Sequence, residues 1–408
     1  MLAGKKIVLG VTGSIAAYKS AMLASSLTQA GAQVDVIMTE AANKLIAPIT
    51  FQSLTKRPVH LDMFKLLDQT DIAHVSLGLA SDLIVIAPAT ANTIAKMASG
   101  LADNLLTTTV LAARCPIIVA PAMDAEMYET PVTQENVAKL RDRGFIVVEP
   151  GYGRLASGLE GRGRLADIEE ILGRIRWVLG RGGDLEGLNL LVTAGGTQEP
   201  IDPVRVITNR SSGKMGYAIA EAALERGARV TLVSAPSSLR PPVGVEFVPV
   251  VTAEEMCEAV LAKLPYVDVL IMAAAVADYR VDSVATQKIK RKDKELQLVL
   301  VPNPDILMET KRALKGVDGP IRVGFAVESE NLEAGAREKL ARKGLDIIVA
   351  NRVDAAGGVF GSDKNEVTMF DASGGRIDVP LASKSHVAHR ILDRIVELHQ
   401  KRAKNGAN

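Results

Sequence analysis

The sequence predicts an α/β protein with two domains, each a parallel sheet between two layers of helices. Its 408 residues exceed one typical core and suit two domains of roughly 200 residues each. Short, continuously apolar runs alternate with helical stretches, which is typical of parallel strands buried on both faces. Each half also carries a glycine-rich turn between a strand-like run and a helix-like run. We therefore expect two three-layer, Rossmann-like domains.

The first half contains five apolar runs that predict the strands of one sheet. They are Ile7–Val11, Val34–Met38, Leu83–Pro88, Ile117–Ala120 and Phe145–Val148. A helix is expected over Ile15–Ala30, because Gly31 is a helix stop and the second apolar run follows directly. This order of strand, helix and strand predicts a βαβ unit.

The second half repeats this order. A strand over Leu190–Thr193, a helix over Gly216–Arg226 and a strand over Gly227–Leu232 predict its first βαβ unit. Further strands are expected over Val267–Met272, Ile321–Ala326 and Ile347–Val349. The glycine-rich stretch Gly180–Asp184 is suited to a linker. We therefore expect domains at residues 1–181 and 182–408.

Composition argues against several classes of protein. A net charge of +1 gives no reason to expect a nucleic-acid partner. No apolar run reaches the roughly 20 residues that span a bilayer, and the first residues lack the pattern of a secretion signal. Cys115 and Cys257 lie in different predicted domains, which argues against a disulfide framework. We expect a cytoplasmic protein without membrane or nucleic-acid partners.

Polar residues in the first half mark a candidate binding site. The turn Gly10–Ser14 resembles a phosphate-binding turn without the full dinucleotide spacing, so a mononucleotide is the better interpretation. Thr90 to Thr93 follow an expected strand at the sheet edge where open α/β folds bind ligands, with a helix cap as the alternative. His74 precedes that strand and has either a structural or a catalytic role.

Four motifs stand out in the first half: Gly13–Lys19, His74, Pro88–Thr93 and Pro121–Met123. Together they resemble the motifs of the homo-oligomeric FMN-dependent cysteine decarboxylases. The resemblance implies a flavodoxin-like flavoprotein domain in which His74 is the active-site base. It also implies that FMN is bound by Gly13, Ser14, Thr39, Thr90, Ala91, Asn92, Thr93 and Ala122.

Two positions depart from the pattern of that family. Asp124 stands where most members have an asparagine thought to bind the substrate carboxylate, which an ionised aspartate would repel. Ser157 stands where a cysteine usually donates a proton, and a hydroxyl is a weaker acid than a thiol. The neighbouring Met123, Met127 and Gly161 keep the family pattern. We therefore interpret Asp124 and Ser157 as parts of a variant catalytic site.

The second half contains four polar or glycine-rich motifs: Asp202–Arg205, Asn209–Gly216, Ala273–Arg280 and Lys288–Lys290. These motifs resemble those of phosphopantothenate–cysteine ligase. In this order, the two halves together resemble the bacterial bifunctional proteins of coenzyme A biosynthesis over nearly the whole chain.

The ligase resemblance implies that CTP activates 4'-phosphopantothenate to an acyl-cytidylate, which the amine of cysteine then attacks. Asn209 is expected to hold the acyl-cytidylate, and Lys288 to stabilise developing charge. The basic run around Lys288 is also typical of a solvated surface. Mg²⁺ is expected with the triphosphate. The residues implied in CTP binding are Ala273, Ala274, Ala275, Asp278, Lys288, Pro304, Asp305, Ile306, Leu307, Phe325, Lys339 and Lys343.

The resemblance as a whole implies an enzyme that converts 4'-phosphopantothenate, cysteine and CTP to 4'-phosphopantetheine. The alternatives are an active ligase joined to a flavoprotein domain with incomplete or lost decarboxylation, or with a regulatory binding role. The motifs leave the preference for CTP over ATP open. A homododecamer of decarboxylase trimers and ligase dimers is also implied.

Overall fold

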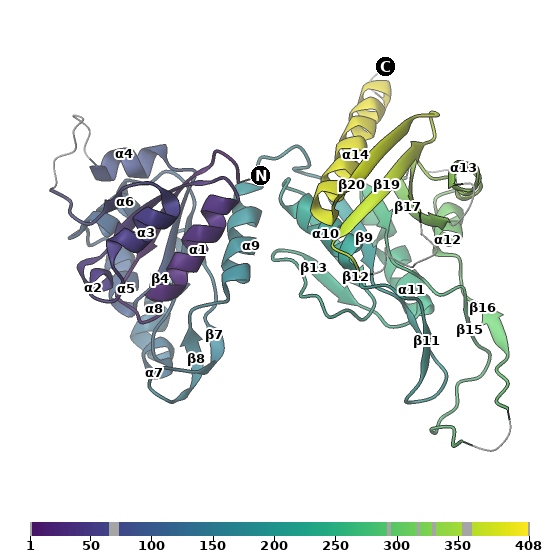
Figure 1. The fold of residues 1–408 in the computed structure, drawn as a ribbon, viewed down its shortest axis with the longest axis horizontal. Coiled ribbons are helices and arrows are strands. Elements are labelled where there is room, and N and C mark those ends of the chain that lie inside the picture. Colours follow the sequence, from purple (N-terminus) through teal and green to yellow (C-terminus); the bar gives the residue numbers. More distant parts are fainter. Residues whose placement is uncertain are drawn as a thin grey trace. The chain divides into compact units, whose positions relative to one another are not determined.

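The computed structural model describes residues 2–64, 73–291, 295–315, 319–328, 332–352 and 361–406. The chain divides into two compact units, Met1–Leu179 and Gly180–Asn408, which are called the first and the second unit (Figure 1). The division lies two residues before the domain boundary expected from the linker composition.

The first unit is built on a six-stranded parallel sheet with the order β3-β2-β1-β4-β5-β6. Its strands are β1 (Lys6–Val11), β2 (Gln33–Met38), β3 (Val59–His60), β4 (Leu83–Ala89), β5 (Ile117–Pro121) and β6 (Ile146–Val147). The five predicted strands are confirmed, and the short β3 is an addition. This is the Rossmann strand order rather than the 2-1-3-4-5 order of flavodoxin. The expected three-layer α/β architecture is confirmed, and the strand order itself was not predicted, because apolar runs locate strands without giving their order.

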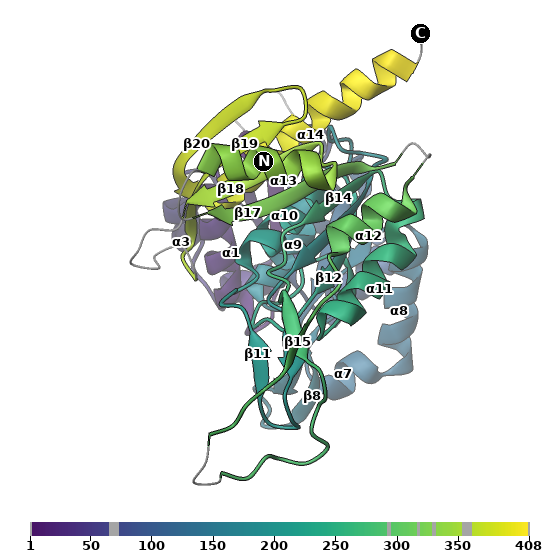
Figure 2. The same cartoon turned by 90° about the vertical axis from the view of Figure 1, so that its right-hand side faces the viewer.

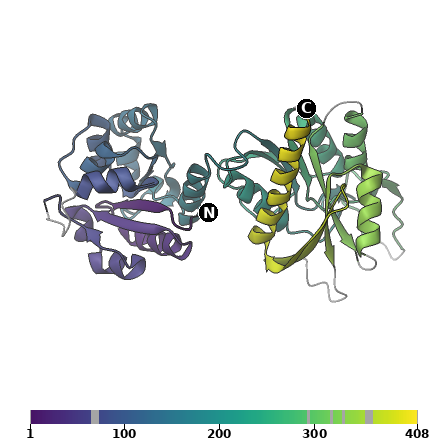
Figure 3. The ribbon, with the colours of Figure 1, turned by 90° about the horizontal axis from the view of Figure 1, so that it is seen from above.

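Helices cover both faces of this sheet (Figure 3). The alternation of side chains along β1 explains the two layers, since Ile7 and Leu9 enter one core and Val8 enters the other. The first core contains side chains of α1 (Ala17–Gln29), α3 (Pro48–Thr55) and α9 (Ile168–Leu179). The second core contains side chains of α5 (Ala91–Ser99), α6 (Leu105–Ala112) and α8 (Pro131–Asp142), with α4 (Ala73–Ala80) packed against it. Short elements complete the unit: α2 (Glu40–Asn43), α7 (Ala125–Glu129), β7 (Gly151–Arg154) and β8 (Glu160–Arg164).

The second unit is built on an eight-stranded sheet with the order β13-β12-β9-β14-β17-β18-β19-β20. Its strands are β9 (Asn189–Ala194), β12 (Arg229–Ser234), β13 (Glu246–Pro249), β14 (Val269–Met272), β17 (Ile321–Glu328), β18 (Ile347–Arg352), β19 (Lys364–Asp371) and β20 (Arg376–Ser383). All the strands predicted for this half are confirmed. The antiparallel pair β19 and β20 was not predicted, because its residues alternate between apolar and polar instead of forming a continuous apolar run.

The helices of the second unit form two layers around its sheet. On one face α10 (Lys214–Leu224) packs against the long α14 (Lys384–Gly406), which is yellow in Figure 3. The core of the other face contains side chains of α11 (Ala253–Lys263), η1 (Leu264–Tyr266), α12 (Ile306–Ala313) and α13 (Leu332–Lys343). Two small antiparallel pairs extend from the unit, and their strands β11 and β15 are seen together in Figure 2. They are β10 (Gln198–Pro200) with β11 (Val206–Thr208), and β15 (Tyr279–Val281) with β16 (Leu300–Pro302).

Within the described residues, no helix is both long enough and apolar enough to cross a membrane.

Candidate active sites

The first unit contains a cavity of about 1220 Å³ at the carboxyl edge of its sheet. The cavity lies where the chain leaves β1, β2 and β4, and the strand order reverses between β1 and β4. Open α/β sheets bind ligands at such a switch point. The structure brings all the predicted FMN residues to the wall of this one cavity: Gly13, Ser14, Thr39, Thr90, Ala91, Asn92, Thr93 and Ala122.

Buried and half-buried threonines shape the floor of the cavity. The hydroxyl of Thr12, which is 1% exposed, donates to Pro88 O at 2.7 Å and accepts from the N–H of Thr90 at 3.0 Å. This connects the turn after β1 to the turn after β4. Thr90 is also the N-cap of α5, because its hydroxyl accepts from the N–H of Thr93 at 3.3 Å. Both interpretations of Thr90, as a helix cap and as a cavity residue, therefore hold together.

The glycine turn brings the chain very close to the next segment. A Cβ at Gly13 would lie 2.4 Å from the Cβ of Ala41, so this position has no room for a larger residue. Thr39 follows β2 and caps α2 by accepting from the N–H of Ala42 at 3.3 Å. The N-terminal turns of α1 and α5 both face the cavity, and helix N-termini favour anions such as phosphate.

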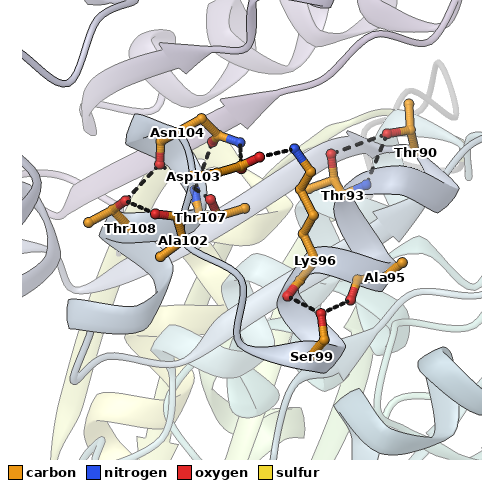
Figure 4. Close-up of polar contacts among 10 residues, drawn as sticks. All are labelled: Thr90, Thr93, Ala95, Lys96, Ser99, Ala102, Asp103, Asn104, Thr107 and Thr108. Carbon is orange, nitrogen blue, oxygen red and sulfur yellow. Dashed lines mark hydrogen bonds and ion pairs between the residues drawn. The ribbon is translucent and has the colours of Figure 1, made fainter.

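A polar cluster that sequence reasoning missed lies on the cavity wall (Figure 4). The ammonium of Lys96 donates to Asp103 Oδ2 at 2.6 Å, and the side-chain amide of Asn104 donates to Asp103 Oδ1 at 2.9 Å. The hydrogen bond from Lys96 lowers the pKa of Asp103. Lys96 follows Thr93 by three residues on α5, a spacing that places both on one helix face and that could have revealed it.

Asp124 and Ser157, the two residues that depart from the family pattern, contact each other at the cavity wall. Ser157, in the turn between β7 and β8, donates to Asp124 Oδ2 at 2.5 Å. Asp124 is the N-cap of α7, and its Oδ1 accepts from the N–H of Glu126 at 3.2 Å. The N–H of Met123 donates to Gly163 O at 2.9 Å, which fixes the base of the hairpin to the same segment. This contact was not predicted, because the two residues are 33 positions apart in the chain.

Of the predicted site residues of the first unit, His74 is not among those that line the cavity in the described part of the chain. It lies on α4. Its Nδ1 is buried, with no hydrogen-bond partner among the described residues.

In the second unit, the loop after β14 lies against the glycine turn after β9. The N–H of Ala275 donates to Gly195 O at 2.8 Å, and the N–H of Thr197 donates back to Ala275 O at 3.3 Å. Gly195 has a φ of +83°, and a Cβ there would lie 2.7 Å from Ala235 O. Glycine is therefore required at this position.

Polar side chains hold the backbone of this loop. Two buried hydroxyls accept from its amides: Thr193 from Ala274 at 3.1 Å, and Thr197 from Ala277 at 2.9 Å. The side chain of Asn209 donates to Val276 O at 3.1 Å. The structure thus brings Asn209 to the predicted Ala273–Asp278 segment. Thr193 and Asn303, which donates to Ala277 O at 2.9 Å, were not predicted as site residues.

Most of the predicted CTP residues form a second group, at α12 and α13. Asp305 is the N-cap of α12, and its Oδ1 accepts from the ammonium of Lys343 at 3.0 Å. Lys339, one turn earlier on α13, donates to Phe325 O at 3.3 Å. The backbone N–H of Asn303 donates to Asp278 O at 2.8 Å, which joins this group to the loop after β14.

Among the described residues, Lys288 belongs to neither of these hydrogen-bonded groups. It is exposed in the segment between β15 and β16, and the hydrogen bonds that fix this segment lie at Ile289 and reach Asp202 and Arg205. Among the described residues, no group of three or more His, Cys, Asp or Glu side chains is arranged to hold a metal ion.

Two family models match the chain and define its class. A model described as "Flavoprotein" matches residues 1–179, and one described as "DNA/pantothenate metabolism flavoprotein C-terminal domain" matches residues 185–398. The protein therefore combines a flavoprotein domain with the C-terminal domain of pantothenate metabolism flavoproteins.

Whole-chain relatives identify the family. The coenzyme A biosynthesis bifunctional protein CoaBC of Bacillus subtilis (strain 168) is 46% identical over 401 residues, which cover 98% of each chain. The protein of the same name from Vibrio parahaemolyticus is 44% identical and covers 97% of this chain and 99% of its own. The chain belongs to this family. It is a bifunctional enzyme of coenzyme A biosynthesis, an FMN-dependent phosphopantothenoylcysteine decarboxylase joined to a phosphopantothenate–cysteine ligase.

Solved structures match each half separately. The crystal structure of the C-terminal domain of a coenzyme A biosynthesis bifunctional protein CoaBC is 42% identical, with a TM-score of 0.46, and covers 54% of this chain and 99% of that one. The FMN-dependent cysteine decarboxylase SpaF is 36% identical, with a TM-score of 0.38, and covers 42% of this chain and 95% of that one.

Proposed function

We propose that residues 1–181 carry the decarboxylase site and residues 182–408 the ligase site. In the first site, FMN is held with its phosphate at the N-terminal turns of α1 and α5, where Ser14, Thr90 and Thr93 supply hydroxyl groups. The fit is supported by the cavity that these residues line, and by the close approach of Gly13 to Ala41, which leaves no room for a side chain at this turn. When bound, FMN supplies the oxidation and the reduction that accompany loss of carbon dioxide.

We further propose that Asp124 and Ser157 act as one unit in this site. The observation that carries the proposal is the 2.5 Å hydrogen bond between them at the cavity wall. The bond occupies one carboxylate oxygen of Asp124 and fixes the direction of the Ser157 hydroxyl. The pair therefore holds a proton next to the reacting carbon, in place of the usual asparagine and cysteine. His74 is proposed as the base of the same reaction.

The test is mass spectrometry of the products that purified, FMN-loaded protein forms from 4'-phosphopantothenoyl-cysteine without oxygen. A product lighter by carbon dioxide alone is expected. Accumulation of the enethiol, which is two hydrogens lighter still, would contradict the proposal that the pair completes the reaction. Ser157→Ala is the matched variant, because it removes the hydroxyl and leaves Asp124 in place.

For the ligase site, we propose that Asn209 and the Ala273–Asp278 loop hold the acyl-cytidylate, and that Lys288 stabilises charge on the reacting phosphate. Mg²⁺ accompanies the triphosphate. The proposed CTP pocket is supported by the hydrogen bonds that join Phe325 to Lys339 and Asp305 to Lys343. Thermal unfolding with CTP and with ATP tests the nucleotide, since the bound one stabilises the protein. Equal stabilisation by both would contradict a preference for CTP.

We also propose a homododecamer of decarboxylase trimers and ligase dimers. Its support in the first unit is an apolar stripe on α1 and the turn before it, where Ile15, Tyr18 and Met22 are 65%, 59% and 57% exposed. Ile15 and Tyr18 also line the cavity, so a second copy on this stripe would complete the site that lacks His74 in one chain. Light scattering that gives the mass of a monomer at micromolar concentration would overturn this assembly. A cytoplasmic location is proposed because Cys115 and Cys257 are both free thiols.

A further inference from the structure

The turn between β10 and β11 contains a tightly held ion pair. Asp202 is 2% exposed, and its Oδ1 accepts from the N–H groups of Val204 at 2.8 Å and Arg205 at 2.9 Å. Its Oδ2 accepts from Nε and Nη2 of Arg205 at 2.9 and 2.5 Å. The carboxylate and the guanidinium are therefore fixed relative to each other by the turn itself.

The Asp202–Arg205 pair makes hydrogen bonds with both the N–H and the C=O of one residue in a distant segment, Ile289. The N–H of Ile289 donates to Asp202 Oδ2 at 3.0 Å, and Arg205 Nη2 donates to Ile289 O at 2.6 Å. Burial alone would raise the pKa of Asp202, but the hydrogen bonds from Arg205, Ile289 and Val204 lower it, so the carboxylate stays ionised. With both its N–H and its C=O engaged, Ile289 has a fixed backbone orientation.

Lys288 and Lys290 flank Ile289, so these hydrogen bonds fix the main chain next to both lysines. Lys288 and Lys290 are exposed, whereas Ile289 is half-buried. A second hydrogen bond, from the N–H of Ala285 to Ile201 O at 3.0 Å, ties the same segment to the same turn. The segment is thus tied to the turn between β10 and β11 at Ala285 and at Ile289, and the second tie lies directly next to Lys288.

We infer that Asp202 and Arg205 are positioning residues for Lys288, acting through the main chain of Ile289. The inference rests on the proposed role of Lys288 in the ligase reaction. An ammonium that stabilises transition-state charge must be held in place before the reaction, and a lysine on an unanchored segment would lose most of that effect.

Arg205→Ala in the full chain tests whether the Asp202–Arg205 pair fixes the segment at Ile289. Arg376→Ala is the matched control. Arg376 is an exposed arginine of the same unit whose ion pairs with Glu333 and Asp378 lie on the surface. Trypsin cleavage after Lys288, Lys290 and Arg291 is expected to be about tenfold faster in Arg205→Ala, because local opening governs proteolysis. The kcat of the ligase reaction is expected to fall about tenfold or more, with decarboxylation of added substrate unchanged. Asp202→Asn, which keeps the shape of the side chain, is expected to act in the same direction.

A double-mutant cycle separates positioning from a general loss of stability. If Arg205 acts through Lys288, the variant with both Lys288→Ala and Arg205→Ala is no slower than Lys288→Ala alone. Multiplied losses in the double variant, or unchanged trypsin cleavage in both single turn variants, would overturn the inference. Full ligase activity in Lys288→Ala would instead contradict the proposed role of Lys288. The trypsin cleavage rates distinguish this outcome from one in which Asp202 and Arg205 do not anchor the segment.

Discussion

The cavity of the first unit and the loop cluster of the second unit both lie where the chain leaves parallel strands at their carboxyl ends, but they are built differently. In the cavity, residues that directly follow strands, such as Thr39 and Thr90, present their own side chains to the ligand space. In the loop cluster, Thr193 and Thr197 are buried, and they hold the backbone of residues 273–278 in place. We therefore expect the first unit to bind its ligand with side chains at helix caps, and the second with a supported backbone and cations from other segments.

The largest expected effect concerns the cation of the second site. Lys288→Ala is expected to slow CTP-dependent ligation about a thousandfold, because a charge placed at the transition state is removed. Pyrophosphate release from CTP with phosphopantothenate measures this rate, and the decarboxylase rate of the same protein is expected to be unchanged.

Lys290→Ala is the matched control for this variant. Lys290 is also exposed, and it lies on the other side of Ile289. Equal losses in the two variants would mean that the basic segment acts through its total charge, as a solvated basic surface would.

This contrast explains how much the sequence could predict. Residues after strands were predicted well, because a polar group directly after a buried apolar run must lie at the carboxyl edge of a parallel sheet. The residues that the family resemblance implies in FMN binding all line one cavity. Two contacts could not be predicted, because they join residues that are far apart in the chain. The Asp124–Ser157 hydrogen bond joins residues 33 positions apart through a hairpin, and the hydrogen bond between Asp202 and Ile289 joins residues 87 positions apart through a turn.

The requirement for a close backbone approach is tested by Gly195→Ala, with Gly374→Ala as control. Both glycines have positive φ angles, but a Cβ at Gly195 would lie 2.7 Å from Ala235 O, whereas nothing lies within 4 Å at Gly374. We expect Gly195→Ala to lower the free energy of unfolding by about 3 kcal/mol and Gly374→Ala by about 1 kcal/mol.

Urea unfolding followed by circular dichroism measures both variants, and fluorescence of the single tryptophan reports on the other unit. That residue, Trp177, belongs to the first unit, so its transition is expected at the same urea concentration in all three proteins. Equal losses for the two glycine variants would show that only the backbone angle matters at Gly195.

Acid stability provides a smaller effect that is specific to the second unit. Asp371 is 5% exposed, and although burial alone would raise its pKa, hydrogen bonds from Ser373 and Gly375 and the ion pair with Arg394 lower the pKa to about 2. The unfolded-state pKa is about 3.9. The charged form therefore stabilises the fold at neutral pH, and this contribution is lost as the pH falls from about 4 to about 2.

Asp371→Asn is expected to lower the free energy of unfolding by about 2 kcal/mol at pH 7 and to have little effect near pH 2. Urea midpoints across this pH range measure the difference. Asp378→Asn is the control, because Asp378 has a side chain that is 59% exposed and its pair with Arg376 is solvated. A loss in Asp371→Asn that stays constant with pH would mean that packing, rather than charge, is the cause.

The smallest expected effect concerns Lys96 of the first site, which contrasts with Lys288 of the second site. Lys96 is already paired with Asp103 on the cavity wall, so it has little net charge to offer a phosphate. Lys96→Ala is expected to weaken FMN binding only about threefold, as for other partly exposed ion pairs. Quenching of flavin fluorescence measures the dissociation constant, and Lys139→Ala, on the exposed surface of α8, is the control. A loss of a hundredfold would mean that Lys96 leaves Asp103 to bind the flavin phosphate, and that both sites depend on a lysine in the same way.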